Sequence, residues 1–304
     1  MRHIFVLLLG LFLFTCDDGD IITIELDFDQ ELELCENNVN SFLVYDVRDD
    51  PSESLILTFP RDPSTEALFT TPTLPDQPAI LDINGGSIRF NFRGYNRNLE
   101  NDELCELIPP ANLVITEDYD ADSGHVFITV TAIDDDNDGV PSALEDINGN
   151  GDLTDDDTDS DGIPNYIDED DDNDNVKTSD ELDNLNLDGD NNPLTNPIDT
   201  DGDGTPNFLD NDDDGDFVLT RLEDQDCNNN PQDDRVINPD GSLGDPFYLV
   251  ESVDESYPCT TFITNSYTRT IITQFRVEGV NLGPVNATEI DFGTYESSFE
   301  VSNE

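Results

Sequence analysis

The sequence predicts a mostly β protein: an antiparallel β-sandwich, then a core-poor acidic repeat with little regular secondary structure, then a short C-terminal β segment. Three observations lead to this prediction. Between Ile21 and Ala132, apolar residues recur with a period of two, as in strands that bury one face. Between Asp134 and Asp226, oxygen-bearing residues recur at fixed offsets instead. From about Pro246 onward, aromatic and β-branched residues return.

The first residues predict a leader and an anchor. We expect residues 1–15 to be a signal peptide, because the apolar run from Ile4 to Phe14 is too short to cross a bilayer. Residues 13–16, Leu-Phe-Thr-Cys, resemble the lipobox of bacterial lipoproteins, although Thr15 stands where that pattern prefers Gly, Ala or Ser. The resemblance implies that Cys16 is lipidated. In the alternative, ordinary signal peptidase cleaves the chain and Cys16 is a bystander.

Residues 16–20 then form a short acidic tether. Acidic residues directly after the cysteine resemble the surface-export signals of Bacteroidetes lipoproteins. This resemblance implies an outer-membrane lipoprotein that is exposed on the cell surface.

Residues 21–132 are expected to form the sandwich. Six to eight strands in about 110 residues are typical of such a fold. The turn sequence Asn84-Gly85-Gly86 predicts a hairpin between two of the strands. The segments with strand-like patterns are 22–28, 42–45, 55–59, 88–92, 113–115 and 126–130.

Residues 133–226 contain seven loops that carry the ligand register of an EF-hand, with oxygen side chains at positions 1, 3, 5, 9 and 12 and a turn residue at position 6. Calcium is a hard cation that takes six to eight oxygen ligands, so this pattern predicts calcium binding. Position 7 should contribute its backbone carbonyl. The predicted ligands, loop by loop, are Asp134, Asp136, Asp138, Val140 and Glu145; Asp146, Asn148, Asn150, Asp152 and Asp157; Asp157, Asp159, Asp161, Ile163 and Asp168; Asp170, Asp172, Asp174, Val176 and Glu181; Asp188 and Asp190; Asp199, Asp201, Asp203, Thr205 and Asp210; Asp212, Asp214, Asp216, Val218 and Glu223.

Two of the seven loops depart from the pattern. The fifth, with Asp188 and Asp190, lacks the closing acid and should bind weakly. The last has Phe217 at position 6, where a sharp turn favours Gly or Asn.

The loops begin only about 11 to 15 residues apart, which leaves no room for the helix pairs of ordinary EF-hands. In tandem, segments 157–168 and 199–210 resemble the thrombospondin type 3 repeat of bacterial surface proteins. That resemblance implies a chain wrapped around a string of structural calcium ions, which replace the apolar core. The whole arrangement resembles uncharacterised lipoproteins of marine flavobacteria.

Residues 227–304 are predicted as a C-terminal β segment, with strands at 247–250, 267–277 and 287–292. Either this segment completes the N-terminal sheet, which makes the repeat a long insertion, or it forms a small unit of its own. An exported chain with four further cysteines favours two disulfides. We predict Cys35–Cys105 and Cys227–Cys259, because each pair then lies on one side of the repeat.

A formal charge of -61 argues against nucleic acid as a partner, and against contact with a membrane other than through the lipid anchor. His125 is the one histidine after the leader, which leaves little material for catalysis, and we expect no enzyme activity. The sequence therefore favours a non-catalytic calcium-binding surface lipoprotein with an adhesion or structural role. The alternative is a glycan- or protein-binding accessory module of a surface uptake system, using aromatic residues such as Tyr95 or Tyr267. The third hypothesis is that the protein is a hydrolase.

Overall fold

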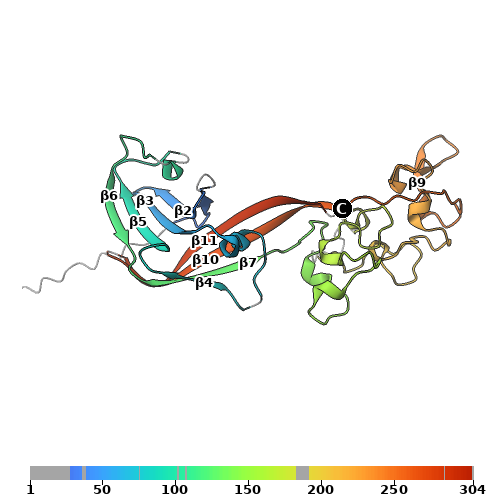
Figure 1. Ribbon diagram of the computed structural model, residues 1–304. Coiled ribbons are helices and arrows are strands. Elements are labelled where there is room, and N and C mark those ends of the chain that lie inside the picture. Colours follow the sequence, from blue (N-terminus) through green and yellow to red (C-terminus); the bar gives the residue numbers. More distant parts are fainter. Residues whose placement is uncertain are drawn as a thin grey trace, which may run out of the picture.

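The computed structural model describes residues 28–35, 39–74, 76–100, 103–106, 108–182, 192–283 and 285–302. A β-sandwich lies at one end of the molecule and the acidic loops lie at the other, with a long hairpin running between them (Figure 1). The predicted leader, the tether with Cys16, most of the strand expected at 22–28, and Asp188 and Asp190 lie outside the described residues. Among the described residues, no helix has the length and apolar character that a bilayer crossing requires.

The predicted mostly β fold is confirmed, and the sandwich has two antiparallel sheets. The first has the order β1-β2-β3-β5-β6 and the second the order β11-β10-β7-β4. The first sheet comprises β1 (Glu33–Leu34), β2 (Ser41–Asp49), β3 (Ser52–Pro60), β5 (Arg89–Tyr95) and β6 (Ile115–Asp120). The second comprises β4 (Ala79–Ile83), β7 (Gly124–Thr131), β10 (Ser266–Leu282) and β11 (Val285–Ser302).

The remaining elements are short. Helix α1 (Pro63–Glu66) begins at Asp62, whose carboxylate accepts hydrogen bonds from the N–H groups of Ser64 and Thr65. Helix α2 (Thr178–Glu181) lies among the acidic loops. A two-stranded ribbon pairs β8 (Arg235–Ile237) with β9 (Leu243–Pro246). Single 3₁₀ turns lie at 67–69, 103–105, 142–144, 153–155, 165–167, 207–209, 220–222, 231–233 and 247–249.

Aromatic rings from both sheets form the sandwich core. Phe90 of β5 meets Phe292 of β11 edge to face, with 5.2 Å between ring centroids. Phe69, from the turn after α1, packs against Phe42 and Phe275 and so reaches both sheets. Each of these rings is buried, and a fully buried Phe contributes about 1.5–3 kcal/mol through removal of apolar surface from water. The period of two in the sequence therefore corresponds to the inward faces of real strands.

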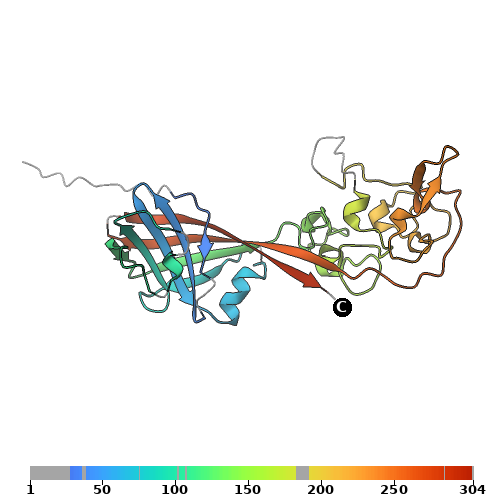
Figure 2. The same cartoon turned by 90° about the horizontal axis from the view of Figure 1, so that it is seen from above.

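The last segment of the chain joins the N-terminal sheet. Strand β10 pairs with β7 from Ile272 opposite Thr131 to Glu278 opposite His125. The sequence left two arrangements open for this segment. The structure has the one in which the segment completes the N-terminal sheet, so that the acidic repeat is an insertion. The hairpin is longer than the short segment expected, with 17 and 18 residues in its two strands. Figure 2 shows its far half leaving the sandwich as a two-stranded ribbon toward the acidic loops.

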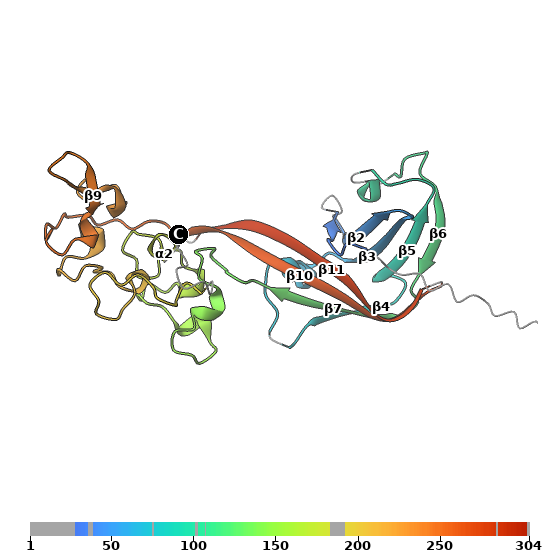
Figure 3. The same cartoon turned by 180° about the vertical axis from the view of Figure 1, so that it is seen from behind.

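Two local predictions were wrong. The turn at 84–86 does not close a hairpin, because β4 and β5 belong to opposite sheets and the turn carries the chain from one to the other. The strand expected at 247–250 is instead a 3₁₀ turn over Phe247–Leu249, and Tyr248 there is buried. Between residue 227 and Ser266 the chain forms the β8–β9 ribbon and lies with the acidic loops, and β10 then begins at Ser266 (Figure 3).

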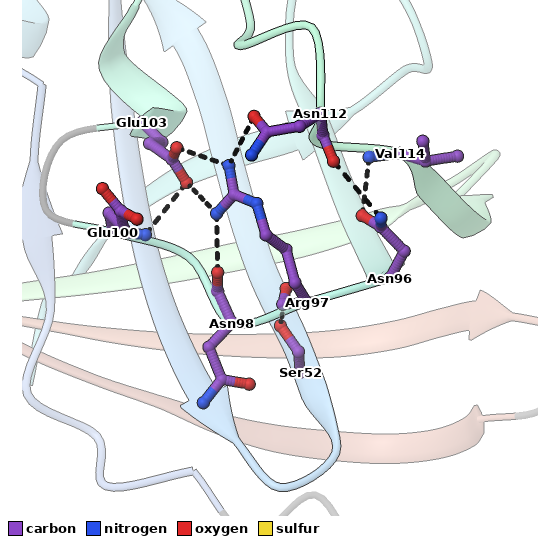
Figure 4. A network of polar contacts seen from close by, with 8 residues as sticks. All are labelled: Ser52, Asn96, Arg97, Asn98, Glu100, Glu103, Asn112 and Val114. Carbon is purple, nitrogen blue, oxygen red and sulfur yellow. Dashed lines mark hydrogen bonds and ion pairs between the residues drawn. The ribbon is translucent and has the colours of Figure 1, made fainter.

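Both predicted disulfides, Cys35–Cys105 and Cys227–Cys259, are present. The first ties the connection between β5 and β6 to the edge of the sandwich. A polar network holds the same connection (Figure 4). The Arg97 guanidinium donates to both oxygens of Glu103, at 2.8 and 2.6 Å, and lowers the pKa of that carboxyl to about 2. Ser52 donates to the Arg97 carbonyl at 2.8 Å, which joins the network to β3.

Candidate metal centres in the acidic loops

Within the described residues, six loops repeat one hydrogen-bond pattern; they begin at Asp134, Asp146, Asp157, Asp170, Asp199 and Asp212. In each, the N–H of position 6 donates to the carboxylate of position 1, at 2.7–3.2 Å. The N–H of position 7 donates to the side-chain oxygen of position 5, at 2.6–2.7 Å. Backbone donors therefore hold one oxygen of each of these side chains, and a carboxylate so held keeps its second oxygen for another partner.

The turn at position 6 has a positive φ in all six loops, at Gly139, Gly151, Gly162, Asn175, Gly204 and Phe217. Phe217 therefore keeps the loop conformation despite its side chain, at φ 76°, and its ring is 95% exposed. A bulky residue is uncommon in this region of backbone space. The last loop is thus built like the others, with its aromatic ring in solvent.

The side chain at position 9 closes most of the loops. In five of the six loops its side-chain oxygen accepts a hydrogen bond from the N–H of position 2, at 2.9–3.3 Å. The residues concerned are Ser142, Asn165, Thr178, Asn207 and Thr220. The sequence pattern places position 9 among the predicted calcium ligands. In the structure, this side chain fastens the two ends of the loop together.

The loops gather carboxylates into compact groups, in which one oxygen from each side chain lies within 4.8 Å of the others. Some groups lie within a single loop, as predicted: Asp134, Asp136 and Asp138; Asp157, Asp159 and Asp161; Asp170, Asp172 and Asp174. Others combine two loops: Asp138 and Glu145 with Asp171, and Asp174 and Glu181 with Asp213. The carboxylate at position 12 of a loop therefore lies beside the carboxylate at position 5 of the same loop and the carboxylate at position 2 of a later loop.

Many of these carboxylates are buried. Asp172, Asp174 and Glu181 are at most 3% exposed, and burial with neighbouring negative charge raises the pKa of each well above its ordinary value. Burial and nearby aspartates raise the pKa of Glu145 to about 9 and that of Glu223 to about 9. Such groups stay ionised at neutral pH only if a cation compensates their charge.

Buried oxygens that lack a hydrogen-bond partner show whether the loops have free ligand atoms for a calcium ion. Within the part of the chain that the structure describes, these buried carboxylate oxygens have no hydrogen-bond partner: one each on Asp134, Asp136, Asp138, Asp156, Asp157, Asp174, Glu181, Asp212, Asp214, Asp216 and Glu223, and both on Glu145, Asp171, Asp172 and Asp213. Buried polar atoms in folded proteins almost always have partners. Hard oxygen donors at this spacing are the ligand set that calcium takes, so the residues present fit the ion.

The predicted ligands are not equally enclosed. The loops that begin at Asp134, Asp170 and Asp212 bury most of their carboxylates, whereas Asp201 and Asp203 are exposed. In the loop that begins at Asp146, the side-chain amides of Asn148 and Asn150 donate to Asp155, at 3.2 and 2.8 Å. That loop is more open than the register alone indicated.

Sequence reasoning missed two sets of residues. The first is position 2 of the enclosed loops, where Asp171 and Asp213 are each 2% exposed. The signal was available, because these loops begin Asp-Asp-Asp while those at 157 and 199 begin Asp-Thr-Asp. The second is an eighth turn, in which the N–H groups of Asn228 and Asn229 donate to Asp224.

This eighth turn shares the backbone of the other loops, with positive φ at Cys227 and Asn229. Its signal was the spacing of Asp224, Asp226 and Asn228, which continues the register past the end of the predicted repeat. The Cys227–Cys259 disulfide fixes it to the returning chain.

The acidic loops contact the hairpin directly. Arg269 of β10 forms an ion pair with Asp135, and the Asn265 side-chain amide donates to the Ile167 carbonyl at 2.7 Å. The N–H of Ser266 donates to Glu169 at 3.2 Å. These contacts hold the loops against the end of the ribbon.

The comparisons with known proteins concern these loops. A family model described as BamM C-terminal matches residues 135–192 and 184–239, about a third of the chain. The family is a C-terminal domain of an outer-membrane-assembly-related protein. Its two matches cover successive halves of the acidic region, including the eighth turn. The thrombospondin type 3 resemblance rests on the sequence motif alone. No curated protein and no solved structure matches this chain.

Proposed function

We propose that this chain is a non-catalytic, calcium-binding accessory protein of the outer membrane, in which calcium ions hold the acidic loops rigid at the end of the β10–β11 ribbon. The observation that carries the proposal is the set of buried carboxylate oxygens without hydrogen-bond partners in the loops. The BamM C-terminal match over the same residues supports the outer-membrane setting. Lipidated Cys16 would anchor the protein on the cell surface, where its role is structural or adhesive.

Calcium suits this place in the cell. Extracellular calcium modules bind with dissociation constants of about 10⁻⁴ to 10⁻³ M, which a calcium-rich exterior saturates. Ion binding to such loops also adds to their folding free energy, because few apolar residues hold the loops together. The apolar cluster among them consists of Val140, Leu182 and Phe208 with three partly buried leucines.

The experiment is a calcium titration of the chelated full chain, followed by calorimetry and small-angle scattering. Binding of several ions, with a decrease in the maximum dimension, is the expected result. A heat of binding indistinguishable from buffer and an unchanged scattering curve would refute the proposal. The sandwich is the internal control, because its disulfide and aromatic core do not depend on calcium.

The alternative function, a binding module for a glycan or protein, would need exposed aromatic rings, and the two rings suggested for it are buried. Tyr95 is 8% exposed and shares a hydrogen bond with Ser54, and Tyr267 is 5% exposed. Neither ring can stack on a sugar while it lies inside the fold. The family match still favours an accessory role beside another outer-membrane protein.

A further inference from the structure

Two groups of carboxylates join loops that are far apart in the sequence. Asp138 and Glu145 of loop 134–145 meet Asp171, the second residue of loop 170–181. Asp174 and Glu181 of loop 170–181 meet Asp213, the second residue of loop 212–223. All six side chains are at most 3% exposed. The same three positions of the register are thus used twice, which makes each group a repeated element rather than a chance contact.

The position-2 side chains point into these groups without a partner of their own. Both carboxylate oxygens of Asp171, and both of Asp213, are buried and lack a hydrogen-bond partner among the described residues. Their backbones are fixed, because Thr178 and Thr220 accept the N–H groups of Asp171 and Asp213, at 3.2 and 3.3 Å. The loop therefore fixes the position of each residue through its backbone, while the carboxylate itself makes no hydrogen bond within the loop.

Among the described residues, no ion pair joins a basic side chain to these groups. The ion pairs found among the described residues join Arg269 to Asp135 and Lys177 to Glu169 nearby, and none involves the six carboxylates. Three negative charges within 4.8 Å repel one another strongly at low effective dielectric. A divalent cation between them removes both this repulsion and the need for hydrogen bonds.

We propose that Asp171 and Asp213 are calcium ligands across loops: Asp171 completes the site of loop 134–145, and Asp213 completes that of loop 170–181. This inference rests on the proposed calcium binding. Each shared ion is a non-covalent cross-link between segments about 30 residues apart, so the enclosed loops form one stack. The loops with Thr158 and Thr200 at position 2 lack the carboxylate and do not make this link.

The direct test is a calcium-loaded crystal structure of the full chain. We expect an ion within about 2.3–2.6 Å of oxygens from Asp138, Glu145 and Asp171 together, and a second ion with Asp174, Glu181 and Asp213. Ions held by single loops, with the Asp171 and Asp213 carboxylates uncoordinated, would overturn the inference and leave the proposed function standing. A chain that binds no calcium would remove both.

Neighbouring substitutions separate the two loops in solution. Asp171→Asn should weaken the ion of loop 134–145 at least about tenfold and spare the ligands of loop 170–181. Asp172→Asn, which removes the same charge one residue later, should weaken the ion of loop 170–181 instead. The amides of Gly139 and Asn175 report each loop separately in calcium-titrated NMR spectra. Equal behaviour of the two variants would overturn the inference.

Two further variants serve as a second test and as a control. Asp213→Asn should weaken the ion of loop 170–181 as Asp171→Asn weakens that of loop 134–145, so misfolding of one variant leaves the other to decide. Asp254→Asn is the charge control, because Asp254 is exposed and lies outside these groups. It should titrate like the unchanged chain.

Discussion

Glu145→Gln should have opposite effects with and without calcium. The side chain closes loop 134–145 at position 12 and is 2% exposed, with no hydrogen-bond partner for either oxygen among the described residues. In calcium, the substitution replaces a charged ligand with a neutral one and weakens the site. In a chelator, the same substitution removes a charge that burial penalises.

The size of the second effect follows from the pKa of Glu145. Burial and the Asp138 and Asp134 carboxylates raise it from 4.5 to about 9 in the folded chain. The folded state therefore binds more protons than the unfolded state, and the free energy of unfolding falls as pH rises from 4.5 to about 9. At about 1.4 kcal/mol per pH unit, the cost at pH 7.5 is about 4 kcal/mol. Glutamine does not titrate and avoids that cost.

Urea unfolding at several pH values, in chelator and in calcium, measures both effects. In chelator at pH 7.5, Glu145→Gln should be more stable than the unchanged chain by up to about 4 kcal/mol, and the difference should vanish near pH 4.5. In calcium the order should reverse. Glu117→Gln on β6 is the matched control, since Glu117 is exposed and should change neither curve. A variant that is less stable in chelator at pH 7.5 would refute the electrostatic reasoning.

Three predictions concern the sandwich. Replacing Cys35 and Cys105 together by serine should lower the free energy of urea unfolding by about 2–5 kcal/mol, and an unchanged midpoint would show that the cross-link does not contribute. Phe292→Ala should cost about 3–5 kcal/mol in the same assay, because the ring is buried against Phe90. Arg97→Ala should return the pKa of Glu103 from about 2 toward 4.5 in an NMR titration. In the unchanged chain, the stability from this pair is present above pH 4.5 and lost as pH falls toward 2; a Glu103 pKa unaltered by the substitution would assign the shift to another group.

Strands could be predicted from the sequence where apolar and polar residues alternate within one short segment. The alternation at 126–130 corresponds to β7, whose Val126, Ile128 and Val130 face the core. The partner of a strand is not a local property, and so the turn at 84–86 was read as a hairpin although it crosses between sheets. Residues 247–250 have strand-like composition, but Tyr248 is buried beside the acidic loops and the chain turns there.

The loops could be predicted because their conformation repeats at fixed spacing. Positions 1, 5 and 6 set the backbone hydrogen bonds, and these depend only on residues a few positions apart. The cross-loop groups depend on which loop faces which, and a one-dimensional register contains no such information. The Asp-Asp-Asp opening of these loops marks Asp171 and Asp213 in the sequence, but only the fold shows that they lie beside Glu145 and Glu181.

The pairing of β7 with β10 has a consequence for how the sandwich folds. Thr131 and Ile272 are partners in the sheet, yet about 140 residues of insertion separate them. Closing a flexible loop of that length costs about 4 kcal/mol of chain entropy. In the ordered insertion, the contacts of Arg269 with Asp135 and of Asn265 with Ile167 bring its two ends together. If calcium orders the insertion as proposed, most of this entropy would already be lost before the sandwich forms. Under the proposed calcium binding, the rate at which the sandwich assembles should therefore rise with calcium, although none of its own residues is a predicted ligand.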